Sequence, residues 1–154
     1  MSDINKILDN LRRQCSRREY CTSDVLKKAE KALEGDKEKA MLVVATLVEE
    51  KYVDDLRYAS AYAREKSAIS GWGEVKIRYM LSAKGIGRDL ISQALEEVDV
   101  QRADNRLVKL LENKYRTLKE DPQCKLKLLR FALGRGYSYD DVKEHIDALI
   151  KEDK

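Results

Sequence analysis

The chain has 154 residues, enough for one average domain or for a few small modules that share a core. Charged residues make up 38% of it, but 31 positive and 28 negative side chains leave a net charge of only +3, which excludes a uniformly basic, chromatin-type protein. Seven glycines and one proline are too few for the frequent turns of a strand-rich domain, so the composition predicts an all-α protein.

Apolar residues recur at helical spacing along most of the chain, and each such stripe is typical of the buried face of an amphipathic helix. In chain order the stripes are Val25, Ala29, Ala32 and Leu33; Leu56, Ala59 and Ala63; Leu90, Ile91, Ala94, Leu95 and Val98; Leu107, Leu110 and Leu111; and Val142, Ile146, Leu149 and Ile150. Together with the breaks between them, they predict about nine short helices joined by short turns.

The segment 72–84 has two apolar faces on a helical wheel, with Lys76 and Arg78 between them. One face holds Ile77, Met80 and Leu81, and the other holds Trp72, Val75, Tyr79 and Ala83. A helix that is apolar on two sides is usually buried between neighbours, so we expect both faces to be covered. The alternative leaves Trp72 and Tyr79 partly exposed beside basic residues, as in protein interfaces and single-stranded nucleic-acid sites.

A helix–turn–helix pattern recurs four times in the sequence. Each copy has a large apolar anchor, a short turn, an aspartate and a new apolar stripe, and the anchors are Tyr20, Tyr52, Ile86 and Tyr137. Five residues before the anchors lie Cys15, Leu47, Leu81 and Ala132, and nine residues before them lie Leu11, Val43, Ile77 and Leu128. We expect these positions to be buried, and the aspartates to stabilise the first turn of each following helix through its dipole.

The repeat indicates a tandem helical array. Its anchors are 32, 34 and 51 residues apart, and the last interval has room for an additional helix. We therefore predict an elongated array of three helical modules, at residues 1–53, 54–99 and 100–154, the second of them basic.

Signatures of catalysis and of metal binding are missing from the sequence. The one histidine, His145, flanks the stripe of the last helix, and no local motif pairs it with Cys15, Cys21 or Cys124. There is no P-loop, no strand followed by GxGxxG and no CxxC. We expect a binding protein and not an enzyme, with no catalytic residue, no metal, no cofactor and three free thiols.

A membrane location is also not indicated. No apolar run approaches the ~18 residues of a membrane-spanning helix, and the first residues lack the charged and apolar regions of a secretory signal. We expect a cytoplasmic, monomeric protein that does not bind a membrane.

The positive charge is concentrated in the middle of the sequence. Residues 56–88 contain seven basic and two acidic residues, a net charge of +5, whereas residues 1–55 and 89–154 each carry −1. Such a local field can attract an anionic partner, and the alternative is an inert, solvated surface. The seven candidates for partner binding are Arg57, Arg64, Lys66, Lys76, Arg78, Lys84 and Arg88. A second basic group comprises Arg12, Arg13, Arg17 and Arg18.

The central residues resemble RecX proteins, which modulate the RecA recombinase. The family motif begins with an acidic pair, R-[FY]-A and a second aromatic residue, which appear here as Asp54-Asp55, Arg57-Tyr58-Ala59 and Tyr62. It continues with a glycine turn, I-x-x-x-L and K-G-I, which appear as Gly71, Ile77 with Leu81, and Lys84-Gly85-Ile86. Residues 16–28 are similar to the family's first motif, with Cys21 in place of a capping serine and Asp24 in place of a glutamate. Residues 130–138 are similar to its last motif, F-L-x-x-R-G-[FY]-S, so that the resemblance covers residues 8–150.

The resemblance implies tandem three-helix modules that bind the groove of a RecA filament on single-stranded DNA. It implies inhibition of ATP hydrolysis, strand exchange and co-protease action in DNA repair and the SOS response. No individual contact residue is transferred, because the family's contacts are spread over a surface, and weak direct binding to DNA is left open.

Two other functions remain as alternatives. One is a helix–turn–helix protein that reads DNA. The sequence argues against it, because acidic residues occupy the helix starts, where base-reading residues should lie. The other is a scaffold of helical repeats with no role at nucleic acid.

Overall fold

The structure, a computed structural model, describes residues 3–153 and contains only α-helices as regular elements within that range. The helices are α1 (Ile4–Arg17), α2 (Thr22–Ala32), α3 (Lys37–Glu49), α4 (Asp55–Ala68), α5 (Glu74–Ala83), α6 (Arg88–Leu95), α7 (Val100–Leu118), α8 (Cys124–Gly134) and α9 (Tyr139–Glu152). The predicted all-α fold with about nine helices is confirmed.

The chain divides into two compact units. The first unit comprises the described part of Met1–Tyr62 together with Leu81–Ala94, and the second comprises Ala63–Met80 and the described part of Leu95–Lys154. The division passes through α4 and α5, so each of these helices contributes to both units. The three modules predicted at residues 1–53, 54–99 and 100–154 stay a prediction.

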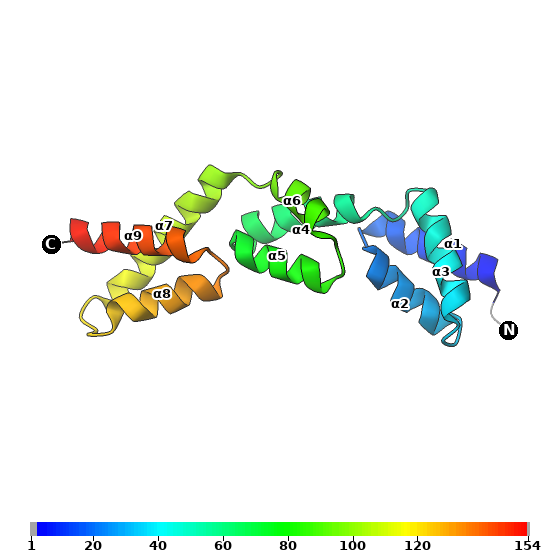
Figure 1. The fold of residues 1–154 in the computed structure, drawn as a ribbon, viewed down its shortest axis with the longest axis horizontal. Helices are drawn as coiled ribbons and strands as arrows, with labels where there is room; N and C mark the ends of the chain where they lie inside the picture. Colours follow the sequence, from blue (N-terminus) through cyan, green and yellow to red (C-terminus); the bar gives the residue numbers. More distant parts are fainter. Residues whose placement is uncertain (1–2, 154) are drawn as a thin grey trace. The chain divides into compact units, whose positions relative to one another are not determined.

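In the first unit, α1, α2 and α3 pack against one another around an apolar core (Figure 1). The core takes one face from each helix, with Leu11 from α1, Val25 from α2 and Leu47 from α3 among its buried members. Val53, just before α4, closes the cluster, and Tyr20 and Tyr52 pack against it with part of their surface exposed. These helices are therefore held together mainly by hydrophobic burial.

In the second unit, α7, α8 and α9 pack in the same manner around their own core (Figure 1). Leu107 and Leu111 from α7, Leu128 from α8 and Ile146 from α9 are each at most 1% exposed. Tyr137, in the turn between α8 and α9, is buried among them.

The predicted repeat corresponds to a repeated turn at the end of α3, α5 and α8. In each turn the amide of the anchor donates a hydrogen bond to the carbonyl five residues earlier, from Tyr52 to Leu47 (2.9 Å), from Ile86 to Leu81 (3.3 Å) and from Tyr137 to Ala132 (3.4 Å). The residue before each anchor has a positive φ, as the Schellman turn at a helix end requires. That motif also brings the anchor against the residue five positions before it, which explains the spacing read from the sequence.

Burial agrees with the repeat. All eight positions five and nine residues before the anchors are buried. Of the anchors themselves, Ile86 and Tyr137 are buried, whereas Tyr20 and Tyr52 are half-buried. The first copy also differs in its turn, because the residue after α1, Arg18, is extended, with φ −159°.

One residue of the apolar stripe predicted for α2 is not buried. Ala32 is exposed, while its neighbour Leu33 is only 8% exposed. Adjacent residues of a helix point about 100° apart, so the end of α2 buries one of the two and turns the other to solvent.

The paired aspartates have structural roles, as expected. Asp54 caps its own helix, since its Oδ1 accepts a hydrogen bond from the amide of Arg57 (3.0 Å). Asp55 instead caps α2, since its Oδ1 accepts from the amide of Thr22 (2.7 Å), 33 residues earlier. Cys21, the N-cap residue of α2, makes no capping hydrogen bond with its own side chain. A carboxylate from α4 thus satisfies the amide of the first residue of α2, which has no partner within its own helix.

Replacing Asp55 by alanine should therefore lower the free energy of unfolding by about 0.5–2 kcal/mol, the usual cost of removing a helix cap. Asp89→Ala is the matched control, because Asp89 also lies in a first turn but is exposed there. Urea unfolding should show a clearly smaller loss for the control. Equal losses in the two variants would mean that the bond to Thr22 contributes nothing beyond the helix dipole.

Candidate partner-binding surface

Arg57, the first of the seven candidate residues, is held within the first unit. Its Nε donates to Oε2 of Glu19 (2.6 Å), and its Nη2 donates to the carbonyl of Tyr52 (3.2 Å). The bond to Glu19 raises the pKa of Arg57 above its ordinary value. This guanidinium joins the start of α4 to the segment between α1 and α2, and Glu19 neutralises much of its charge.

Lys84, at the end of α5, has a similar role. Its Nζ donates to Oδ1 of Asp24 (2.9 Å), and its carbonyl accepts from Oγ of Ser23 (2.7 Å). The bond to Asp24 raises the pKa of Lys84. Burial alone would raise the pKa of Asp24, but hydrogen bonds from Lys84 and Cys21 outweigh it, and the pKa lies below its usual value. The pair therefore links α2 to the end of α5 within the first unit.

Two further arginines lie beside carboxylates in the second unit. Nε of Arg78 donates to Oε1 of Glu74 (2.9 Å), one helical turn earlier on α5. Nη1 of Arg64 lies 3.9 Å from Oε2 of Glu97, at the limit of an ion pair, and both side chains are 55% exposed. Exposed pairs of this kind contribute little to stability, so Arg64 keeps most of its capacity to bind a partner.

Lys66 and Lys76 lie against an aromatic ring. Their Nζ atoms are 4.9 Å and 4.3 Å from the ring centre of Trp72, within the distance for cation–π attraction. Lys66 comes from α4 and Lys76 from α5, and all three residues belong to the second unit. We call Trp72, Lys66 and Lys76 the Trp72 cluster.

The backbone around Trp72 is fixed from both sides. The amide of Trp72 donates to the carbonyl of Lys66 (2.9 Å), and the hydroxyl of Tyr137 donates to the carbonyl of Gly71 (3.0 Å). The amide of Gly73 donates to the carbonyl of Arg135 (2.9 Å). The turn that carries the indole is therefore bonded to the turn between α8 and α9, in the same unit.

That bonding depends on two glycines. A Cβ atom at Gly73 would lie 2.5 Å from the backbone of Gly136, and one at Gly136 would lie 2.2 Å from Cβ of Lys76. Only glycine lets the two backbones approach so closely. The sequence indicated turns at both places but not that they meet.

Arg88, the last candidate, is exposed at the start of α6 and makes no ion pair with any residue of the described chain. The structure thus separates the seven candidates by partner. Four lie beside carboxylates, namely Arg57, Arg64, Arg78 and Lys84. Two lie over the Trp72 ring, and Arg88 is exposed.

The expectation that both apolar faces of residues 72–84 are buried was wrong. Ile77 and Leu81 are at most 1% exposed, but Val75 and Tyr79 are 52% and 72% exposed, and Ala83 is exposed as well. Only the first face meets the core, and the second faces solvent with Trp72 half-buried at its beginning. The alternative interpretation, aromatic residues exposed beside basic ones, is the one that the structure supports.

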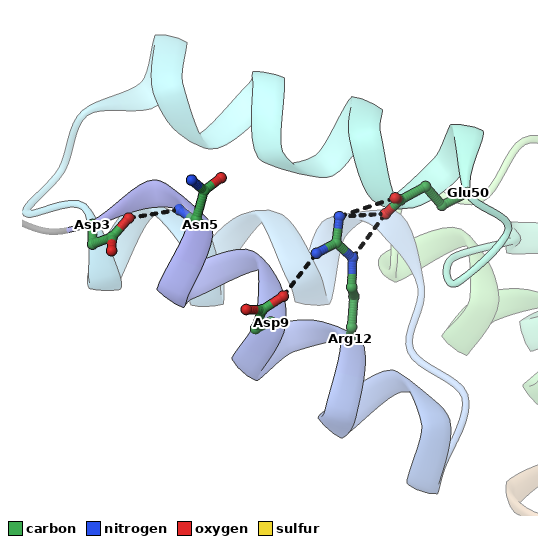
Figure 2. Close-up of polar contacts among 5 residues, drawn as sticks. All are labelled: Asp3, Asn5, Asp9, Arg12 and Glu50. Carbon is green, nitrogen blue, oxygen red and sulfur yellow. Dashed lines mark hydrogen bonds and ion pairs between the residues drawn. The ribbon is translucent and has the colours of Figure 1, made fainter.

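The second basic group is also partly neutralised within the first unit. Figure 2 shows Arg12 of α1 between two carboxylates, with Nε and Nη2 donating to Glu50 at the end of α3 and Nη1 donating to Asp9 (each 2.9 Å). The bond to Glu50 raises the pKa of Arg12. Arg12 therefore joins α1 to α3, and the basic group loses one of its four charges to that contact.

Two more rings are flanked by pairs of cations, which the sequence did not reveal. Arg18 and Lys28 lie 4.7 and 5.1 Å from the ring centre of Tyr20 in the first unit. Lys114 and Arg135 lie 5.1 and 5.3 Å from that of Phe131 in the second unit. The one available signal was a basic residue four positions after Trp72 and after Phe131, although Trp72 lies in the turn before α5 and not on the helix.

Catalytic and metal-binding arrangements are not found in residues 3–153. No group of three potential ligands among these residues could hold a metal ion. Nε2 of His145 lies 2.7 Å from Oδ1 of Asp104, so that this histidine has a polar partner and does more than pack. The three cysteines are free, with Cys15 and Cys21 buried and Cys124 half-buried. No described helix is both long and apolar enough to span a membrane.

These features define an all-α protein assembled from three-helix units, with basic residues beside half-buried rings. Comparison with known families gives two matches. Residues 54–95 match the model of the second three-helix domain of RecX, and residues 103–146 match that of the third. The chain belongs to the RecX family, which consists of regulatory proteins and not of enzymes.

Relatives in individual organisms agree with this assignment. The chain is 32% identical over 115 residues to a regulatory protein RecX of Clostridium tetani, covering 72% of this chain and 52% of the relative. It is 36% identical over 118 residues to that of Clostridium perfringens (strain 13 / Type A), covering 74% and 54%. The chain spans about half the length of these curated relatives.

Solved structures share the fold. A crystal structure of a regulatory protein RecX superimposes with a TM-score of 0.82 at 23% identity, covering 94% of this chain and 71% of the other. RecX from Lactobacillus salivarius superimposes with a TM-score of 0.80 at 23% identity, covering 95% and 96%. At this level of identity the likeness shows the fold.

Proposed function

We propose that this chain regulates the RecA recombinase by binding to the RecA filament on single-stranded DNA. Binding inhibits or modulates ATP hydrolysis, strand exchange and co-protease activity of the filament, in the cytoplasm, during DNA repair and the SOS response. The observation that carries the proposal is the match of residues 54–95 and 103–146 to successive RecX domains. The chain then acts by binding alone, without a cofactor.

The residues that we assign to this contact are a subset of the seven candidates and come from both units. Arg57, Arg78 and Lys84 each donate a hydrogen bond of 2.6–2.9 Å to a carboxylate, which offsets much of the charge that each could offer to a partner. We assign the contact to the remaining four, which are Arg64, Lys66, Lys76 and Arg88. Surface charges mainly steer and position a partner, over a range of about 8–10 Å at physiological salt.

A reader of double-stranded DNA is the less favoured function. Acidic residues lie at the starts of α2, α4, α6 and α9, at the positions where a recognition helix places its base-reading side chains. These carboxylates would meet phosphates and base edges with the wrong charge.

Three binding measurements separate the functions. The protein is offered DNA alone, both single-stranded and duplex, RecA alone, and the RecA filament on single-stranded DNA, and ATP hydrolysis by the filament is followed in parallel. We expect the tightest binding to the filament, together with reduced ATP hydrolysis. Tightest binding to bare duplex would support the DNA reader, and binding to none of the partners would support the scaffold.

Reversing the four assigned cations to glutamate should weaken binding to the filament by about tenfold or more at physiological salt, because an attractive field becomes repulsive. The four substitutions are Arg64→Glu, Lys66→Glu, Lys76→Glu and Arg88→Glu. Circular dichroism should show an unchanged helical content, because Arg64 and Arg88 are exposed and Lys66 and Lys76 keep part of their surface in solvent. Substitutions at the surface usually cost within ~0.5 kcal/mol each.

The matched control makes the same change of net charge on exposed residues of α7, α8 and α9, with Lys109→Glu, Arg116→Glu, Arg130→Glu and Lys143→Glu. The control should bind the filament and inhibit its ATP hydrolysis nearly as strongly as the parent chain does. If both quadruple variants behave alike, net charge alone governs the interaction and the assigned surface is wrong.

A further inference from the structure

A pocket of about 270 Å³ lies within the second unit, to which all of its lining residues belong. The buried side chains of Ile77, Leu107 and Tyr137 form part of its wall. Val75 and Val100 also line it but are 52% and 77% exposed, so they lie where the pocket opens to solvent. Pockets for whole small molecules usually measure roughly 300–1,000 Å³, so this smaller and largely apolar one is suited to a single side chain.

The pocket is formed before any partner arrives, because its two sides are joined through the backbone. The amide of Val75, in the first turn of α5, donates to the carbonyl of Gly136 (2.8 Å). The amide of Gly73 donates to the carbonyl of Arg135 (2.9 Å). These bonds hold the start of α5 against the turn between α8 and α9, so little conformational freedom is lost when the pocket is filled.

The pocket has an excess of negative charge. Its lining includes the carboxylates of Glu74, Asp104 and Asp141 and the guanidinium of Arg78. Arg78 donates to Glu74 (2.9 Å), so these two charges largely offset each other. Asp104 has one oxygen engaged, since Nε2 of His145 lies 2.7 Å from its Oδ1, and Asp141 makes no ion pair with any residue of the described chain. Two carboxylates, one on α7 and one on α9, therefore remain as hydrogen-bond acceptors.

These features select among the chemical groups that could enter the pocket. An anion is repelled by the carboxylates, and a neutral apolar group would take water from them without replacing its hydrogen bonds. A cation on an apolar stem satisfies both the carboxylates and the apolar wall. A guanidinium is better suited than an ammonium, because its five donors lie in one plane and can reach acceptors on two helices, and because it is less strongly hydrated.

We propose that this pocket binds an arginine side chain of a partner protein, with the guanidinium between Asp104 and Asp141 and the methylene stem along the apolar wall. Val75 and Val100, at the opening, contact an apolar residue beside that arginine in the partner. The proposal goes beyond the regulation of RecA proposed above, because it assigns a basic protein segment to an acidic pocket, whereas the filament contact is assigned to cations.

A set of matched peptides tests this recognition. The isotopically labelled intact chain is titrated, without RecA, with acetyl-Gly-Leu-Arg-Leu-Gly-amide, and its amide signals are followed by NMR. Saturable shifts should be concentrated at lining residues such as Val75, Ala103 and Asp141. A peptide with citrulline, the uncharged analogue of arginine, should bind about tenfold more weakly or worse, because it loses the charged hydrogen bonds. No saturable shift, shifts scattered over the surface, or equal affinity for the two peptides would overturn the proposal.

Removing the two carboxylate charges tests the polar part of the site. Asp104→Asn with Asp141→Asn keeps the shape of the pocket and should weaken binding of the arginine peptide by about tenfold or more, while removing the preference over the citrulline peptide. The matched control, Asp140→Asn with Glu144→Gln, makes the same change of net charge on exposed residues of α9 outside the lining. It should bind as the parent chain does, and equal losses in the two double variants would contradict the assigned site.

Filling the pocket tests its apolar part. Ala103→Leu should weaken the arginine and citrulline peptides alike, by about fivefold or more, because each methylene kept out of the pocket is worth roughly fourfold in affinity. Ala148→Leu, on an exposed part of α9 outside this lining, is the control and should change neither affinity. If a pocket variant does not fold, the peptide series on the parent chain decides the question. Filament binding is measured separately, so a chain that binds the filament but not the arginine peptide overturns this proposal alone.

Discussion

Replacing Leu81 by alanine should lower the free energy of unfolding by about 2–5 kcal/mol, the range for truncating a fully buried leucine. The side chain of Leu81 has no exposed surface. Its carbonyl also accepts the hydrogen bond from the amide of Ile86 that closes the turn after α5. A cavity at this position would loosen both the core and the packing of Ile86, which follows in the same turn.

Urea unfolding measures this loss, and Leu42→Ala is the matched control. Leu42 belongs to the same unit but is 68% exposed on α3, so its truncation should change the stability by no more than about 0.5 kcal/mol. A loss below about 0.5 kcal/mol for Leu81→Ala would show that the core position assigned to it by the repeat is wrong.

Gly136→Ala should destabilise the second unit by about 2–5 kcal/mol. The new Cβ would lie 2.2 Å from Cβ of Lys76 and 2.8 Å from its amide nitrogen, so the backbones must separate. Overpacking of this kind costs about 1–3 kcal/mol. The φ of Gly136 is +94°, a region in which any other residue adds about 1–2 kcal/mol.

Gly134→Ala provides the control two residues away. Gly134 is the last residue of α8, and a Cβ there meets no atom within 4 Å, so this variant should be neutral or slightly more stable. Thermal unfolding compares the two variants, and tryptophan fluorescence should shift only in Gly136→Ala, because Lys76 lies over the Trp72 ring. Equal stability of the two variants would mean that the close approach of the two turns is not needed.

The repeat and its core could be predicted because their signals are local. The spacing of five residues between Leu81 and Ile86 follows from the turn that closes a helix, and the same chemistry produces it after α3 and α8. The apolar stripes likewise follow from the period of the helix. Ala32 was misplaced because a stripe cannot decide between adjacent residues at the last turn of a helix.

The partners of the charged residues could not be predicted, because they lie far apart in the sequence. Arg57 and Glu19 are 38 residues apart, and Lys84 and Asp24 are 60 residues apart. The net charge of residues 56–88 marked the basic part of the sequence, but it treated cations beside carboxylates and exposed cations alike. The solvent-facing side of α5 was missed for a related reason, since a helical wheel shows two apolar faces without showing which one has a neighbour.

Four long-range polar contacts of residues 12–24 share one direction along the sequence. Arg12 bonds to Glu50, Glu19 to Arg57, the amide of Thr22 to Asp55, and Asp24 to Lys84. Every one of these partners follows later in the sequence. Ribosomes extend a chain by about 5–20 residues per second. During synthesis, the partners of these four contacts are therefore added several seconds after the first two helices. In that interval α1 and α2 are stabilised only by hydrophobic packing, chiefly against α3. The ion pairs to Arg57 and Lys84 add to their stability after the middle of the chain has been synthesised.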